Sequence, residues 1–149
     1  MKIYSDREFI IVRSSFSVLK KINLENIGFK QIQDSNLYSY QSNEYKILNY
    51  SIKPKLIFII KKEKKNVYLK LKSINVKNIP FIFNLLKVNI ELNIFSEGDF
   101  CKARRHISIK YGVKNELIAN LSGNFINKIL NNLIESISIR FDNKLIKKV

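Results

Sequence analysis

The sequence predicts a single α+β domain, in which a curved antiparallel sheet of seven strands is covered by one long C-terminal helix. Two observations indicate this class. Strand-length runs separated by short turns fill most of the first 111 residues, which favours an antiparallel meander. From Gly123 onward the hydrophobic period lengthens to three or four residues, as in an amphipathic helix. A length of 149 residues fits one core, so we treat residues 1–149 as one domain.

The N-terminal part is expected to form a strand followed by a short helical segment. Glu8–Phe16 is rich in β-branched and aromatic residues and has the length of a strand. Ser17–Asn23 then places apolar residues at helical spacing. Gly28 and a polar cluster after it interrupt the pattern, and the second strand is expected at Leu37–Gln41.

Three further strands are expected in the middle of the chain. Tyr45–Ile52 follows a turn, and Leu56–Ile60 is an apolar run that suits a strand covered on both faces. Val67–Lys72 alternates apolar and polar residues, after which the apolar residues fall on the opposite phase. A β-bulge near Ser73 would account for that change.

A β-hairpin is expected next. Residues 83–95 hold the clearest alternation, with apolar side chains at every second position from Leu86 to Ile94. Ser96–Asp99 forms a turn with glycine late in the loop, so the strand Phe100–Tyr111 should pair back on its predecessor.

The C-terminal helix is expected to begin at Ser122–Asn124, which offer N-cap side chains. Burial of its apolar stripe would contribute on the order of 10 to 20 kcal/mol before entropy, so the fold should depend on it. The stripe consists of Ile126, Ile129, Leu130, Leu133, Ile137, Phe141 and Leu145.

The net charge of +15 suggests a polyanionic partner, but composition accounts for much of it. Ile, Lys and Asn supply 25, 22 and 18 residues, whereas Arg supplies 5, a profile typical of an AT-rich genome. We therefore favour a solvated, lysine-rich surface over a dedicated nucleic-acid site.

Several kinds of chemistry are disfavoured by the residues present. Cys101 and His106 are the only cysteine and histidine, so no disulfide or Cys/His zinc cluster can be built, and no cofactor is expected. The four glycines are too scattered for a phosphate-binding loop. His106 falls on the polar phase of its strand and Cys101 on the apolar phase, so we expect an exposed imidazole, an inert buried thiol and no enzyme.

The alternative function is a basic nucleic-acid-binding or membrane-surface adaptor. Residues 102–106 are the densest basic cluster that contains arginine, and single-strand binders combine such charge with aromatic stacking. The aromatic candidates are Tyr38, Tyr40, Tyr45 and Tyr50. We favour the simpler interpretation that these tyrosines pack beside the core. The longest apolar run, Leu56–Ile60, is far short of the roughly twenty residues of a membrane span, so a transmembrane protein is not expected.

The order of elements resembles the helix-grip or START-like (SRPBCC) superfamily, whose members hold apolar ligands between sheet and helix. The chain is also similar to a poorly characterised branch of that superfamily from cyanobacteria and plastids, for which no activity is known. The matching segments are Pro54–Ile60, Ser122–Ile126, Ile129–Leu130 and Arg140. Lys114–Ile118 departs from the proline-rich approach to the last helix in that branch.

This resemblance implies a location in the chloroplast stroma if the gene lies in the organelle, and otherwise in a bacterial cytoplasm. The N-terminus agrees, because Asp6, Arg7 and Glu8 interrupt any apolar run that could act as a signal peptide. The resemblance implies no known activity. Together with the absence of a catalytic constellation in the sequence, it favours a noncatalytic protein that binds an apolar or amphipathic small molecule between the sheet and the C-terminal helix.

Arg105 is the one charged residue on the apolar phase of Phe100–Tyr111, so we predict that it lines a concavity between sheet and helix. A buried guanidinium requires an acceptor, which would be an acidic side chain, backbone carbonyls, or the carboxylate or phosphate of a ligand. A bulge or a place near the open end of the sheet would instead let it reach water. The candidate ligand-binding residues are Arg105, Tyr111, Val88, Ile90, Leu133 and Ile137.

Overall fold

The structure is a computed structural model that describes residues 2–12, 25, 28–47, 50–64, 66–76, 86–98, 100–111 and 116–148. Its elements within these ranges are β1 (Lys2–Val12), β2 (Phe29–Gln31), β3 (Leu37–Gln41), β4 (Tyr45–Ile47), β5 (Tyr50–Ile52), β6 (Lys55–Lys62), β7 (Asn66–Asn75), β8 (Leu86–Glu97), β9 (Phe100–Tyr111) and α2 (Glu116–Lys148).

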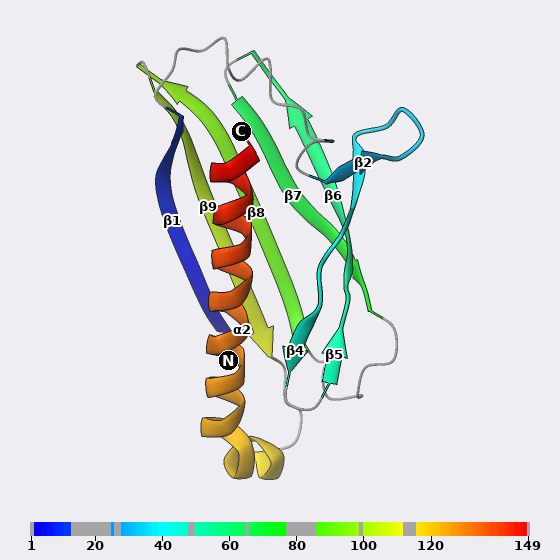
Figure 1. The fold of residues 1–149 in the computed structure, drawn as a ribbon. Coiled ribbons are helices and arrows are strands. Elements are labelled where there is room, and N and C mark those ends of the chain that lie inside the picture. Colours follow the sequence, from blue (N-terminus) through cyan, green and yellow to red (C-terminus); the bar gives the residue numbers. More distant parts are fainter. Residues whose placement is uncertain are drawn as a thin grey trace.

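Seven of these strands form one antiparallel sheet in the order β1-β9-β8-β7-β6-β3-β2. The sheet curves, and α2 lies along its concave face, where it packs on β1 and β9 (Figure 1). β4 and β5 pair only with each other in the described part of the chain and form a separate ribbon. The predicted class, a curved seven-stranded antiparallel sheet with a long C-terminal helix packed on it, is confirmed.

The β8–β9 hairpin follows the predicted alternation. The two strands pair without interruption from Leu86 opposite Tyr111 to Glu97 opposite Phe100. Gly98 in the turn has φ of +60°, a left-handed conformation that glycine adopts without steric cost. The late position of glycine in this loop was therefore a correct turn signal.

The predicted β-bulge is also present in β7. Ile57 of β6 lies opposite Ser73, whereas the next residue, Phe58, lies opposite Leu71. Lys72 is therefore the extra residue, and it shifts the side chains of β7 from one face of the sheet to the other. This shift is the change of phase seen in the sequence.

The strand set differs from the prediction at two places. β2 was missed because three residues are too few to show a period; it exists through pairing with β3 and through Phe29, which is buried. The expected strand Tyr45–Ile52 is instead the β4–β5 ribbon, since its two halves pair with each other. The main sheet still has seven strands, because it includes β2, which was not predicted, and lacks Tyr45–Ile52, which was.

Two boundaries also differ from the prediction. β1 begins at Lys2 rather than Glu8, because it pairs with β9 along its whole length. α2 begins at Glu116 rather than at Ser122–Asn124, so Gly123 lies inside the helix and costs it roughly 1 kcal/mol relative to alanine. Residues 13–16 and the helical segment predicted at Ser17–Asn23 lie outside the described residues.

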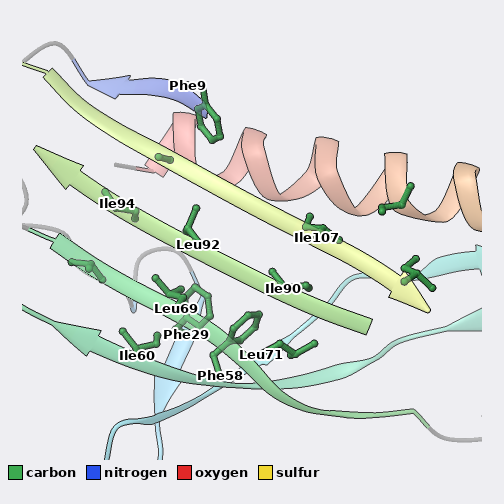
Figure 2. Packing of buried hydrophobic residues seen from close by; sticks show 14 of the residues in the cluster. Phe9, Phe29, Phe58, Ile60, Leu69, Leu71, Ile90, Leu92, Ile94 and Ile107 are labelled. Atoms are coloured by element: carbon green, nitrogen blue, oxygen red, sulfur yellow. The ribbon is translucent and has the colours of Figure 1, made fainter. Parts of the chain in front are cut away.

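The core lies between the concave face of the sheet and α2. Neighbouring strands contribute side chains in register: Ile60 lies opposite Leu69, and Leu69 lies opposite Leu92 (Figure 2). The largest fully buried hydrophobic side chains are Phe58, Leu69, Leu92, Ile94, Ile107, Ile109 and Leu130. Each contributes roughly 1.5 to 3 kcal/mol by leaving water, so these side chains are the main source of the stability of the fold.

Candidate functional site

Two adjoining faces of α2 meet the rest of the molecule. Leu130, Ile134, Ser138 and Asp142 are buried and follow one another at intervals of four residues. A neighbouring stripe is half-buried; it consists of Ile129, Leu133, Ile137 and Phe141. The apolar pattern found the half-buried stripe and Leu130, but it missed Ile134 and the two polar residues of the buried line.

Arg105 points from β9 towards α2, as predicted, and its side chain is only 3% exposed. Its Nε donates a hydrogen bond of 2.7 Å to Oδ1 of Asp142, and its Nη2 donates one of 3.1 Å to Oδ2. Nη1 donates to the backbone oxygen and to Oγ of Ser5, both at 3.0 Å. The buried charge is therefore paired and hydrogen-bonded, which offsets the cost of removing it from water.

Arg7 lies directly opposite Arg105 in the β1–β9 pair, where two like charges would repel each other. The carboxylate of Asp142 separates them, because its Oδ2 also accepts a hydrogen bond of 3.0 Å from Nη1 of Arg7. The side chain of Arg7 is 53% exposed, so its other donors reach water. We call Arg7, Arg105 and Asp142 the arginine cluster; it joins β1, β9 and α2.

The acceptor predicted for Arg105 is thus an acidic side chain of the protein itself. The described partners of this buried guanidinium all belong to the protein itself, and a role of Arg105 towards a ligand stays a prediction. The sequence did hold a signal for Asp142. An acceptor was required, and Asp142 continues the four-residue spacing that begins at Leu130.

Four of the other five candidate residues have described side chains, and these lie at different depths in the packing between sheet and helix. Ile90 is buried in the core, whereas Val88, Leu133 and Ile137 are half-buried and pack against it. The side chain of Tyr111 lies outside the described residues. Of the six candidates, Leu133 borders the groove described next.

A groove of about 490 Å³ opens between the β4 end of the ribbon and α2. Its volume lies in the range typical of small-molecule sites. It is lined by Glu44, Tyr45 and Lys46 on one side and by Ile129, Asn132, Leu133, Ser136 and Arg140 on the helix. The lining combines apolar and charged side chains, which suits an amphipathic occupant.

Two cation–π contacts link α2 to strands β3 and β4. The guanidinium carbon of Arg140 lies 3.9 Å from the ring centre of Tyr45 in β4. Nζ of Lys144 lies 4.3 Å from the ring centre of Tyr40 in β3 and donates a hydrogen bond to its hydroxyl. Together with the arginine cluster, these contacts tie α2 to strands on both sides of the concave face.

Glu44 borders the groove, and neighbouring residues favour the ionised form of its carboxyl group. A hydrogen bond from Ser51 lowers the pKa of the Glu44 carboxyl below its usual range, and the positive charges of Lys46 and Lys53 act in the same direction. Glu44 therefore remains ionised at neutral pH. Its negative charge is attracted by Lys46 in β4 and by Lys53, which follows β5.

The basic cluster at residues 102–106 is largely neutralised on the convex face. Two ion pairs account for this: Lys102 with Glu97 at 3.0 Å, and Arg104 with Glu8 at 3.1 Å. The ring of His106 is hydrogen-bonded to Asp6. Cys101 on the opposite face is buried, and this burial raises the pKa of its thiol, which makes a reactive thiolate unfavourable at neutral pH.

The described residues offer neither a metal site nor a membrane span. Within these ranges, no group of three or more His, Cys, Asp or Glu side chains is placed to hold a metal ion. Among the same residues, no helix has both the length and the apolar character needed to cross a membrane.

No family model and no curated protein matches the sequence. The structure is similar to that of the Zhui aromatase/cyclase from Streptomyces sp. R1128, with a TM-score of 0.63 and 5% sequence identity over 98% of this chain and 92% of that one. Two weaker matches are a Thermus thermophilus protein, TTHA0849 (TM-score 0.47, 9% identity, 97% of each chain), and a START superfamily protein from Mycobacterium smegmatis (0.39, 12%, 91% of this chain and 98% of that one).

The likeness to the aromatase/cyclase concerns the fold, because so few residues are shared. The helix-grip fold that the order of elements suggested is confirmed. The narrower resemblance to a family of cyanobacteria and plastids stays a prediction.

Proposed function

We propose that this chain is a noncatalytic binding protein that holds an apolar or amphipathic small molecule in the groove between β4 and α2. The observation that carries the proposal is the groove itself, about 490 Å³ in volume, with Ile129 and Leu133 on its helix wall and charged residues around them. Both side chains remain half-buried. A ligand that covers them gains roughly 25 cal/mol for each Å² of apolar surface removed from water.

The reactive groups of the chain support a noncatalytic role. His106 lies on the convex face, away from the groove, and is paired with Asp6. The Cys101 thiol is buried and its pKa is raised, so it is held in the protonated form. Neither group lines the groove.

Native mass spectrometry of the protein purified from its own host tests this function. The wild-type protein is expected to retain a small molecule that denaturation releases. Leu133→Trp fills the groove and is expected to abolish this retention while the protein stays folded. Ile139→Trp is the matched control, because Ile139 is 52% exposed on the same helix and does not line the groove. Equal retention by the Leu133 variant and the control would refute the groove as the binding site.

A further inference from the structure

We infer that the groove binds amphiphiles with an anionic head, a carboxylate or a phosphate monoester, and that Arg140 is the residue that anchors this head. This inference rests on the proposed function and narrows it to a class of ligand. It starts from the charges of the lining, which are Lys46 and Arg140 against Glu44.

Arg140 is the cation of the lining that is farther from compensation, since the charge of Lys46 also acts on Glu44. Among the residues that the structure describes, neither Arg140 nor Lys46 forms an ion pair with a carboxylate. Glu44 is the one acidic residue of the described lining, so two cations face one carboxylate. The resulting net positive charge of the lining favours an anionic head over a neutral or cationic one.

The contact with Tyr45 prepares Arg140 for this role. Its guanidinium carbon lies 3.9 Å from the ring centre of Tyr45, which is within cation–π distance. A guanidinium carries five N–H donors in a fork that can bind two oxygens of a carboxylate or phosphate at once. The contact with Tyr45 also restricts the side chain before a ligand arrives, so less conformational entropy is lost on binding.

The helix wall arranges polar and apolar residues in two parallel rows. Asn132, Ser136 and Arg140 follow one another at intervals of four residues, and Ile129 and Leu133 form the row beside them. Ile129 and Arg140 are eleven residues apart, which is about 16 Å along a helix. A ligand of that length would place its tail on the apolar row and its head at Arg140, with Asn132 and Ser136 available for hydrogen bonds.

Isothermal titration calorimetry with decanoate, decyl phosphate and decanol tests the inference. The wild-type protein is expected to bind at least one of the two anions about ten-fold more tightly than decanol, as expected for charge-assisted hydrogen bonds. The tighter of the two anions identifies the head as carboxylate or phosphate. Arg140→Gln is expected to remove this preference, so that neither anion binds more tightly than decanol.

Two further variants separate anchoring from general charge. Arg104→Gln removes the same charge from the convex face and is expected to keep the preference for an anion. Tyr45→Ala removes the aromatic ring without removing a charge and is expected to weaken anion binding by less than Arg140→Gln does. An Arg140→Gln protein that still prefers the anion overturns the assignment of Arg140.

The outcomes also distinguish the inference from the proposed function. If wild-type protein binds decanol as tightly as both anions, the anionic class is wrong while the proposed function stands. If it binds none of the three probes and retains no small molecule from its host, the proposed function fails and the inference fails with it.

Discussion

Arg105 and Asp142 form an ion pair in which both side chains are buried, 3% and 5% exposed. Such a pair contributes little net stability when compared with apolar residues of similar size, because both charges have lost their hydration. Removal of one partner, in contrast, is strongly destabilising, because it leaves the other charge buried and unpaired. At this position the pair acts mainly to fix where α2 lies on β1 and β9.

Replacement of Asp142 by leucine is therefore expected to lower the free energy of unfolding by about 3 to 5 kcal/mol. The double variant Arg105→Met, Asp142→Leu should recover most of this loss, because it removes both buried charges. Urea denaturation measures both values. A double variant as unstable as Asp142→Leu would show that lost packing, rather than the unpaired guanidinium, causes the effect.

At the level of elements, α2 is the one described helix that covers the concave face of the sheet, and the buried side chains of Leu130 and Ile134 belong to it. The ribbon β4–β5, in contrast, is peripheral to the core. It pairs with no strand of the main sheet among the described residues, and Tyr45 ties it to α2 through Arg140. The groove thus lies between an element on which the core depends and one that is peripheral to it.

A chain that ends at Leu121 is expected not to fold. It loses Leu130 and Ile134, each worth roughly 1.5 to 3 kcal/mol when fully buried, together with Asp142, and a domain has a net stability of only about 5 to 15 kcal/mol. Circular dichroism and thermal unfolding provide the measurement. Removal of residues 147–149 alone is the control and should leave a cooperative transition. A stably folded fragment ending at Leu121 would contradict this architecture.

For the whole molecule, the net charge of +15 is the dominant electrostatic property. It will attract any polyanion at low salt, whatever the fold. However, the charges of Lys102 and Arg104 in the basic cluster at residues 102–106 are paired with Glu97 and Glu8, and Arg105 is buried. The structure thus supplies no concentrated cationic surface at the place where the sequence suggested one.

Binding to a random single-stranded RNA is accordingly expected to be weak and to vanish near physiological salt. Fluorescence anisotropy at increasing salt concentration measures it. Replacement of Lys102 and Arg104 by glutamine should change the affinity little, because both side chains are already paired. Submicromolar affinity that persists at physiological salt, and that these substitutions reduce, would favour the nucleic-acid adaptor instead.

Local sequence signals predicted most of the fold. The alternation from Leu86 to Ile94, the late glycine Gly98 and the phase change at Ser73 each depend on residues close together in the chain, so pattern and turn chemistry were sufficient. The same signals failed for β2, which is too short to show a period, and for the start of α2, where Gly123 resembled a helix boundary but lies inside the helix.

The candidate site was less predictable, because its contacts join residues far apart in the chain. Arg105 was identified as an inward charge from its strand phase alone, but 37 residues separate it from Asp142. Tyr45 and Arg140 lie on two elements whose approach no periodicity encodes.

The sequence by itself thus determined the fold class, the faces of the strands and the need for an acceptor near Arg105. Only the tertiary structure decided that this acceptor is Asp142 and that a groove lies beside Arg140. The physical reason is that periodicity reports which side of an element is buried, whereas the partner across that surface depends on how distant elements pack together.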